Sequence, residues 1–374
     1  MTPPVRQALS VQPPKKSKIL IISRHDYRTA RKASVHFVAR NMADSGHDVS
    51  FLSVGYSWLS RLRGDNRSAL FHRANRWEEV DGVRSNLWRS TWHPIKLPIP
   101  DRMVGWLYSI WSRAPFAALD EAARVADLII VESGIAPALL PRIRAAAPGA
   151  KIVYRATDLL ETAGVPSCIE TMLWQSRKDI DIVIVVARAM LDHFDHFDCP
   201  RIFIPHGVDM EGLSRPTDNP YSGRRNVVSV GSMLFDHTAI NMLALAMPHY
   251  TFHLIGTPKG KFPDNVIEYG EMSFARTLPY LQHADVGIAA YRRAAASEYL
   301  ADSSLKLKQY GAIGLPAVCP HFAVGDNSMR FGYAPERPED IIQAFVRAMN
   351  ARRQPLPVKD WRDVADELVE VALG

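Results

Sequence analysis

The sequence alternates short, almost uninterrupted Ile and Val runs with stretches of helical periodicity, and it does so twice. In the first array the apolar runs lie at residues 18–23, 48–54, 127–131, 151–154 and 182–186. In the second array they lie at residues 226–230, 251–255 and 285–289. Apolar runs without polar alternation are typical of parallel strands covered on both faces by helices. The sequence therefore predicts an α/β protein with two Rossmann-like, doubly wound domains that face a cleft.

A stretch with three prolines and two glycines, residues 205–220, separates the two arrays. We therefore expect an N-terminal domain at residues 17–205 and a C-terminal domain at residues 206–357. A last helix within residues 358–374 has no strand after it, so we expect it to pack back on the N-terminal domain. Residues 1–16 are rich in proline and lysine and lack an apolar core, which predicts a disordered lead-in that is not a secretory signal.

Composition narrows the possible classes of protein. The three cysteines, Cys168, Cys199 and Cys319, are far apart and form no CxxC pair, which argues against a disulfide framework and a structural zinc site. No apolar run reaches the roughly 18 residues that a membrane-spanning helix requires. The formal net charge of +6 suits an anionic membrane, a nucleic acid or an acidic substrate, and the position of the charges must decide between them.

Residues 304–316, SLKLKQYGAIGLP, follow a predicted strand and open a helix. A helix N-terminus offers free N–H groups and the positive end of a dipole, which suit a phosphate. Lys306, one turn in, can add a charge-assisted hydrogen bond, and Gln309 on the same face can bind a ribose hydroxyl. From spacing alone, an ordinary crossover helix with an exposed lysine explains the segment equally well.

This segment resembles the nucleotide-binding helix of GT-B glycosyltransferases, in which a K-x-x-E-Y-x-A-x-G-x-P pattern recurs. The chain has Gln309 where the acid is usual, so the side chain can still accept from a hydroxyl but supplies no charge. Residues 204–209 (IPHGVD) resemble the P-N-G-V-D entry to the second domain of the same superfamily. Residues 230–241 (VGSMLFDHTAIN) are similar to its glycine loop beside the donor. Three matches in the right order imply a GT-B fold.

Over essentially its whole length the chain resembles the membrane-associated β-glucuronosyltransferases of xanthan-type exopolysaccharide assembly, glycosyltransferase family 70. The resemblance implies inverting, metal-independent transfer of glucuronic acid from UDP-glucuronate, the donor substrate, to the mannose of a polyprenyl-diphosphate-linked oligosaccharide. It implies no further cofactor and a peripheral location on the cytoplasmic face of the bacterial inner membrane. With the loop glycine and the helix start, the implied donor-binding residues are Gly231, Ser232, Met233, Glu271, Met272, Tyr291, Ser304, Leu305, Lys306 and Gln309.

Inversion requires a base that takes the acceptor's proton, and such a base contributes roughly 10²–10⁴-fold to the rate. Asp158 lies in YRATDLLE, directly after a predicted strand and so at the cleft, and the resemblance implies that it is this base. The motif also fits a helix cap at Thr157 or Asp158, with Glu161 completing a capping box. Glu132 and Asp26 follow other strands and remain alternative bases.

Two further polar sets stay open. A glucuronate donor requires a cation near its carboxylate, and the sequence does not choose between Arg28, Arg31, Arg155, Arg292 and Arg293. His193 and His196 are three residues apart, as metal ligands on a helix can be. The neighbouring acids fit a solvated helix end better, and a lysine, arginines and helix dipoles can hold the leaving diphosphate without a metal.

Residues 58–111 interrupt the α/β alternation and contain six of the eight tryptophans. Residues 59–113 contain ten Lys or Arg and five Asp or Glu. This composition is typical of a segment that lies in a membrane interface. It predicts that an anionic membrane surface contacts Trp88, Trp92, Trp106 and Trp111. In a helix at residues 103–111, Met103, Leu107, Ile110 and Trp111 would lie near one face, which could contact the membrane.

Other functions fit parts of the sequence. The segment at residues 58–111 can instead pack into the core of the first domain, or bind single-stranded nucleic acid. A UDP-sugar epimerase of the same fold would require no lipid acceptor and leave this segment unexplained. A transferase to a lipid-linked oligosaccharide with a different donor would use the same motifs. A nucleic-acid binder would show steeply salt-dependent binding, and we expect no nucleic-acid partner.

Overall fold

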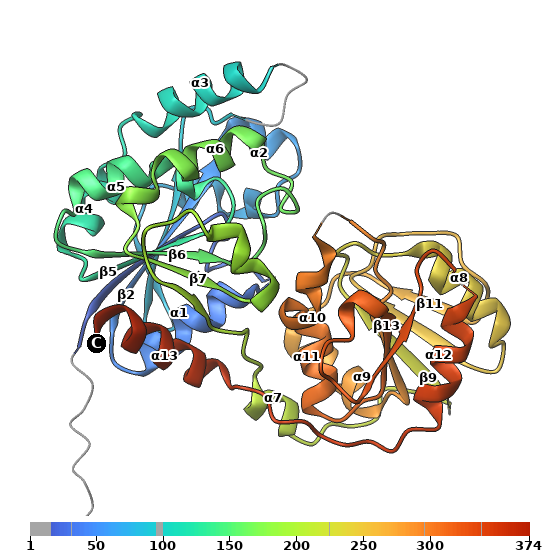
Figure 1. The fold of residues 1–374 in the computed structure, drawn as a ribbon. Coiled ribbons are helices and arrows are strands. Elements are labelled where there is room, and N and C mark those ends of the chain that lie inside the picture. The colour runs from blue at the N-terminus through green and yellow to red at the C-terminus, as the bar shows by residue number, and fades with distance from the viewer. Residues whose placement is uncertain (1–15, 31, 95–99, 224, 295, 338) are drawn as a thin grey trace, which may run out of the picture.

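The computed structural model describes residues 16–374 except 31, 95–99, 224, 295 and 338. The chain forms two α/β domains, each built on its own sheet, which lie side by side in Figure 1. The first sheet has eight strands in the order β3-β4-β2-β1-β5-β6-β7-β8, and the second has six in the order β11-β10-β9-β12-β13-β14. The expectation of two doubly wound domains is confirmed. Apart from its last residue, the predicted lead-in lies outside the described residues.

The N-terminal domain consists of a nearly all-parallel sheet with helices on both faces. Its strands are β1 (Lys18–Ser23), β2 (Asp48–Tyr56), β3 (Glu78–Val80), β4 (Val83–Arg89), β5 (Leu128–Glu132), β6 (Lys151–Ala156), β7 (Ile182–Val185) and β8 (Arg201–Phe203). Its helices are α1 (Ser34–Asp44), α2 (Trp58–Leu62), α3 (Asp101–Ser112), α4 (Ala117–Val125), α5 (Leu140–Ala146) and α6 (Ser167–Gln175). Along β1, Leu20 and Ile22 enter one core and Ile19 and Ile21 the other, which explains the uninterrupted apolar run.

The prediction that the α/β pattern fades within residues 58–111 is wrong. Strand β4 joins the sheet parallel to β2, with Val83 opposite Val49, and β3 forms an antiparallel hairpin with it. The run VRSNLWR escapes a search for apolar strands because it buries Ser85 and Asn86 among its apolar residues.

Two of the four tryptophans predicted to contact a membrane are core residues. Trp88 is 5% exposed and Trp111 is 1% exposed, and the ring of Trp88 stacks on Phe116 with centroids 3.8 Å apart. Trp111 shares the inner face of α3 with Val104 and Tyr108, so it does not lie with Met103 and Ile110 as predicted. A large aromatic ring stabilises the fold more when it is buried in the core than when it stays at the surface, which accounts for the burial of these two tryptophans.

The outer face of α3 carries apolar side chains that the described part of the chain leaves uncovered. Met103 is 50% exposed and Trp106 is 64% exposed, and Ile110 and Trp92 are also exposed. Among the described residues, no helix combines the length and the apolar character that crossing a bilayer requires. The predicted membrane contact is therefore restricted to surface side chains, with Trp92 and Trp106 remaining from the predicted set.

The C-terminal domain repeats the doubly wound pattern with an all-parallel sheet. Its strands are β9 (Asn226–Val230), β10 (Thr251–Ile255), β11 (Val266–Tyr269), β12 (Val286–Ile288), β13 (Ala317–Pro320) and β14 (Arg330–Tyr333). Its helices are α8 (His237–Ala246), α9 (Phe274–His283), α10 (Leu300–Ser303), α11 (Leu305–Ala312) and α12 (Asp340–Met349). Gly314 follows α11 with φ +66°, and a Cβ there would lie 2.5 Å from Pro355 N, so only glycine fits this turn.

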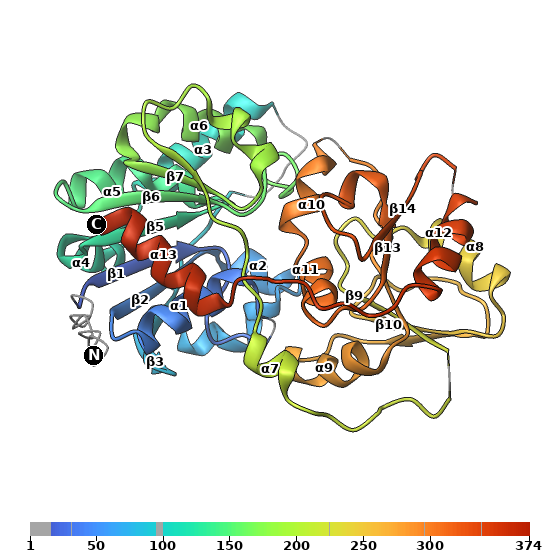
Figure 2. The same cartoon turned by 60° about the horizontal axis from the view of Figure 1, so that its bottom comes forward.

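The last helix, α13 (Trp361–Leu373), returns to the N-terminal domain, as expected. Figure 2 shows it lying along α1. Trp361 stacks on Phe37 at 5.4 Å, and Ser45 Oγ donates to Asp366 Oδ1 at 2.8 Å. The chain passes between the domains twice. A β-bridge between Val208 and Asp360 pairs the two crossing segments, and the Asp360 carboxylate also caps α13. The short helix α7 (Met210–Ser214) follows the first crossing.

Candidate active site

Loops at the carboxyl edge of the second sheet bring together four of the residues predicted to bind the donor. Lys306 Nζ donates to Gly231 O at 3.5 Å and lies 5.1 Å from the centre of the Tyr291 ring. The Tyr291 hydroxyl lies 2.6 Å from Ser304 Oγ, and that oxygen caps α11 by accepting from Leu307 N. Gly231 has φ +85°, a conformation that lets the backbone of its loop approach the lysine.

The remaining predicted donor residues differ in their positions. Ser232 and the exposed Met233 continue the loop after β9, and Glu271 and Met272 follow β11 at the same edge of the sheet. Gln309 lies along α11 and is half-buried. The side chain of Leu305 instead packs against an apolar cluster of the N-terminal domain, so it closes the gap between the domains.

Lys306 is half-buried, and its ammonium group has no carboxylate partner among the described residues. Burial lowers the pKa of Lys306 to about 7, because the charged form loses water without gaining a counter-charge. The first turn of α11 adds the positive end of a helix dipole at the same place. This arrangement favours an anion with more than one negative charge.

Asp158 belongs to the N-terminal domain, where it lies in the loop that follows β6, and it is half-buried. Ser133 holds its backbone, with Ser133 Oγ donating to Asp158 O at 2.9 Å. The hydroxyl of Tyr299, from the C-terminal domain, donates to Asp158 Oδ1 at 3.3 Å. Burial raises the pKa of Asp158 to about 6, the charge of Glu132 adds to the rise, and the Tyr299 hydrogen bond opposes it.

The capping interpretation of this motif does not fit the structure. Residues after Asp158 form turns, and the next helix, α6, begins at Ser167. The Asp158 carboxylate is therefore oriented by tertiary contacts and not by a helix N-terminus.

The two alternative bases are buried in ion pairs. Glu132 accepts from Arg155 at 2.5 Å and from Ser23 Oγ at 3.1 Å; burial raises the pKa of Glu132, and Arg155 opposes the rise. The Asp26 carboxylate forms an ion pair with the Arg28 guanidinium, with a nitrogen–oxygen distance of 2.9 Å. Burial alone would raise the pKa of Asp26, but the hydrogen bonds and the charge of Arg28 keep this pKa below its usual value. Of the three carboxylates, Asp158 is the most accessible.

The arginines that could bind the glucuronate carboxylate also differ in the partners that they have. Arg28 and Arg155 serve the buried ion pairs, and Arg293 pairs with Glu336 at 2.7 Å. Arg292, next to Tyr291, is exposed and donates through Nε to Phe235 O at 3.2 Å. Among the four that the structure describes, Arg292 is the one without a carboxylate partner; Arg31 lies outside the described residues.

The two histidines that raised a metal site have separate partners. His193 Nε2 lies 3.0 Å from Glu170 Oε1, and the ring of His196 packs on Trp174 with centroids 5.3 Å apart. Within the described part of the chain, no group of three or more His, Cys, Asp or Glu has the arrangement that a metal ion requires.

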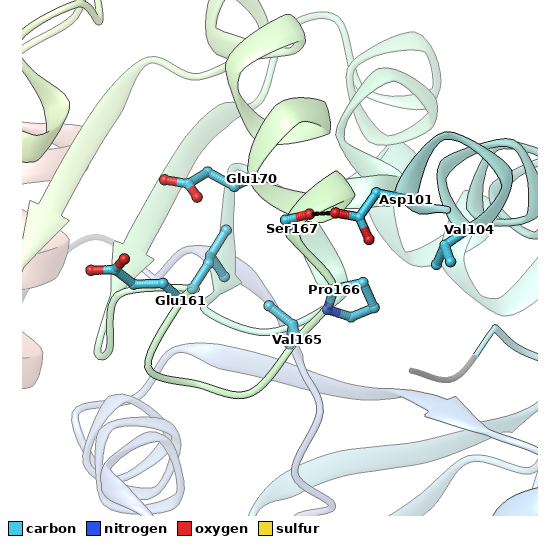
Figure 3. Close-up of a pocket in the computed structure, with 8 residues that line it drawn as sticks. Asp101, Val104, Glu161, Val165, Pro166, Ser167 and Glu170 are labelled. Atoms are coloured by element: carbon cyan, nitrogen blue, oxygen red, sulfur yellow. Dashed lines mark hydrogen bonds between the residues drawn. The ribbon is translucent and has the colours of Figure 1, made fainter. Parts of the chain in front are cut away.

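A cavity of about 330 Å³ opens beside the Asp158 loop, between α3 and α6. Figure 3 shows carboxylates of both helices and of the loop that precedes α6 around it, with Ser167 donating to Asp101. Its lining combines acidic and apolar side chains: Asp101, Val104, Leu160, Glu161, Val165, Pro166, Ser167 and Glu170. Such a lining suits a ligand with many hydroxyl groups and an apolar ring face, as in a sugar.

A family profile described as the N-terminal domain of glucuronosyltransferase GumK matches residues 21–186. A curated relative, UDP-glucuronate:glycolipid 2-beta-glucuronosyltransferase of Xanthomonas campestris pv. campestris, is 39% identical over 364 residues, 94% of this chain and 89% of the relative. This chain belongs to the GumK family of glucuronosyltransferases.

Solved structures place this GumK-family member in the GT-B fold. The apo structure of OtsA has a TM-score of 0.64 and 11% identity, and covers 96% of this chain and 99% of that chain. A UDP-forming α,α-trehalose-phosphate synthase of Burkholderia xenovorans, in complex with glucose-6-phosphate, has a TM-score of 0.65 and 10% identity, covering 96% and 100%. At such low identity these likenesses show the fold alone.

Sequence reasoning missed Tyr299 and the cavity residues Asp101 and Glu170 of this GumK-family member. Tyr299 lies in SEYL, which matches none of the motifs used to find the donor site. Its contact with Asp158 joins two domains, and local patterns carry no signal for such a contact.

Proposed function

We propose that this protein transfers glucuronic acid from UDP-glucuronate to the mannose of a polyprenyl-diphosphate-linked oligosaccharide, forming a β-linkage with inversion. The observation that carries the proposal is the 39% identity with the glycolipid glucuronosyltransferase, which extends through both domains. The geometry supports it: an anion seat at Lys306 and a half-buried carboxylate, Asp158, belong to different domains, and Tyr299, seven residues before Lys306, contacts that carboxylate. A base and a diphosphate seat on opposite sides of a gap are what displacement at a sugar carbon requires.

In this mechanism Asp158 accepts the proton of the acceptor hydroxyl while the bond to the diphosphate breaks. Lys306 and the N–H groups of the first turn of α11 stabilise the charge that develops on the leaving diphosphate. The Tyr291 ring and Gly231 hold the lysine in place. The two domains thus supply different halves of the reaction.

The experiment that tests the function is a donor screen. The purified protein is incubated with UDP-glucuronate, UDP-glucose or UDP-galactose and a lipid-linked trisaccharide that ends in mannose. We expect a glycolipid larger by one glucuronic acid with the first donor alone, and an anomeric NMR signal that shows the β-linkage. Transfer from UDP-glucose or UDP-galactose instead would contradict the proposed specificity for UDP-glucuronate. Isomerised UDP-sugar without an acceptor would favour an epimerase.

We propose that the sugars of the acceptor bind in the cavity between α3 and α6. Leu160 and Glu161, from the loop that carries Asp158, line it, and Glu161 and Glu170 can accept hydrogen bonds from sugar hydroxyls. The apolar outer face of α3 lies on the far side of Asp101 and Val104, so the lipid can stay in the membrane while the sugars reach the base. We place the protein peripherally on the cytoplasmic face of the bacterial inner membrane.

Replacing Met103 and Trp106 together by serine is expected to weaken binding to phosphatidylglycerol vesicles by about tenfold. The two side chains are exposed on α3, and burying apolar side chains in the interface provides the binding free energy. Vesicle flotation measures the change. Leu245→Ser is the matched control, because Leu245 is 70% exposed on α8 of the other domain. Equal loss in both variants would contradict a docking face on α3.

Replacing Lys306 by alanine is expected to weaken UDP binding roughly 10- to 100-fold, since one hydrogen bond between charged groups is lost. The pKa of Lys306, about 7 in the free protein, should rise when the diphosphate binds. The folded protein must then take up a proton on binding, so affinity falls as the pH rises above about 7. Calorimetry at pH 6.5 and 8.5 in two buffers measures both effects. An unchanged pH dependence in Lys306→Ala would place the titrating group elsewhere.

A further inference from the structure

We infer that Tyr299, a residue of the donor-binding domain, is a positioning residue for Asp158 that orients the base only when the two domains are docked. The inference rests on the proposed function, because it assigns Tyr299 a part in the same reaction. It concerns a residue that none of the donor motifs contains.

The contact joins a buried phenol of one domain to half-buried groups of the other. Tyr299 is 2% exposed and ends the short 3₁₀ turn Ser297–Tyr299. Its hydroxyl lies 3.3 Å from Asp158 Oδ1 and 3.2 Å from Thr162 Oγ1. Among the described residues, it is the one group that donates a hydrogen bond to this carboxylate. Asp158 Oδ2 is thereby left for the hydroxyl of an acceptor.

A phenol is suited to this task because it remains a donor while the base changes its charge. Burial, followed by the charge of Asp158, raises the pKa of Tyr299 far above its ordinary value, so the hydroxyl keeps its proton at any working pH. A neutral donor fixes the carboxylate without neutralising it. A cationic donor in the same place would make Asp158 a weaker base.

The same segment of chain carries the diphosphate seat. Tyr299 is followed by α10, then by Ser304, which caps α11, and then by Lys306. A second tie joins this segment to the N-terminal domain, because Asp302 Oδ2 accepts from Arg188 N at 3.0 Å. Donor contact at Lys306 and base contact at Tyr299 therefore belong to one short stretch. If the C-terminal domain moves away from the N-terminal domain, Asp158 therefore loses Tyr299 and the bound donor at the same time.

The charges that face Asp158 come from several elements, so the effect of Tyr299 must be separated from theirs. Glu132 on β5 raises the pKa of Asp158, and Arg24 after β1 and Arg155 on β6 lower it. A Tyr299→Phe substitution changes none of these groups. It removes one hydrogen bond that favours the ionised carboxylate, so the pKa of Asp158 should rise.

The test is the pH profile of kcat/KM for UDP-glucuronate and the lipid-linked trisaccharide, in the wild type and in Tyr299→Phe. We expect kcat/KM at pH 7 to fall roughly tenfold, as for loss of a hydrogen bond to a charged group. The acidic limb of the profile should move to higher pH, and the Kd for UDP should stay unchanged. A merely structural role would lower activity without moving the limb.

Two control variants sharpen the result. Tyr221→Phe removes a comparable buried phenol, which donates to Tyr280 O at 2.7 Å within the C-terminal domain, and should leave the profile as in the wild type. Thr162→Val removes the other partner of the Tyr299 hydroxyl and should keep the limb in place. A wild-type profile in Tyr299→Phe would overturn the inference. A wild type that transfers no glucuronic acid would instead overturn the proposed function.

Discussion

An Asp158→Ala variant is expected to lose transfer by a factor of at least about 10², while its Kd for UDP stays unchanged. We propose this carboxylate as the base, and a positioned base contributes roughly 10²–10⁴-fold. The proposed UDP contacts lie on the other domain, at Lys306 and Gly231, so we expect them to survive the change. Single-turnover transfer and calorimetry with UDP measure the two quantities. Asp192→Ala, at an exposed acid of the same domain, is the control.

The same carboxylate predicts a pH dependence of both activity and stability. The pKa of Asp158 is about 6, so kcat/KM should fall as the pH decreases through 6 and the base becomes protonated. The folded pKa lies above the unfolded value, so the protonated carboxyl stabilises the fold and the ionised one costs stability at pH 7. Asp158→Asn should therefore be inactive without a lower Tm at pH 7.5. Full activity in either variant would exclude Asp158 as the base.

An Arg155→Met variant is expected to lose about 3–5 kcal/mol of unfolding free energy, because it leaves the buried Glu132 without its cation. Arg155 also lies 3.5 Å from His206 Nδ1, beside the first crossing between the domains. Urea unfolding followed by circular dichroism measures the loss. The control is Arg215→Met, which breaks an exposed ion pair with Glu211 and should cost at most about 1 kcal/mol.

The cost in Arg155→Met should also depend on pH. Without the arginine the pKa of Glu132 rises further in the folded state, while in the unfolded chain it keeps its ordinary value. The folded state then holds a proton that the unfolded state has released, so stability falls as the pH rises from 5 to 8. An equal loss at both pH values would mean that packing, and not charge, makes Arg155 important.

Much of the fold could be predicted because parallel strands buried on both faces leave uniform apolar runs. Strands such as β1 and β9 begin and end where the sequence placed them. Strand β4 could not be found in this way, since Ser85 and Asn86 are buried within it. The tryptophans show the complementary limit: composition located an aromatic segment, but it could not tell the buried Trp111 from the exposed Trp106.

The candidate site divides in the same way. Gly231, Tyr291 and Lys306 could be placed together because each follows a strand or opens a helix at one edge of one sheet. The partner of Asp158 could not, because Tyr299 is 141 residues away in sequence and belongs to the other domain. Packing between domains depends on the shapes of both surfaces, which no local spacing encodes.

The return of α13 to the N-terminal domain limits how this enzyme can be recombined with its relatives. The C-terminal domain is in effect an insertion, since the chain crosses at Val208 and again at Asp360, and the two crossings are paired. A graft that exchanges the C-terminal domain must therefore join the chain at both places. A single junction near residue 205 would combine α1 with a foreign α13, and the Trp361–Phe37 stack shows how closely these two surfaces are matched. During synthesis, too, the face of α1 that α13 covers stays open until the whole donor domain has been made.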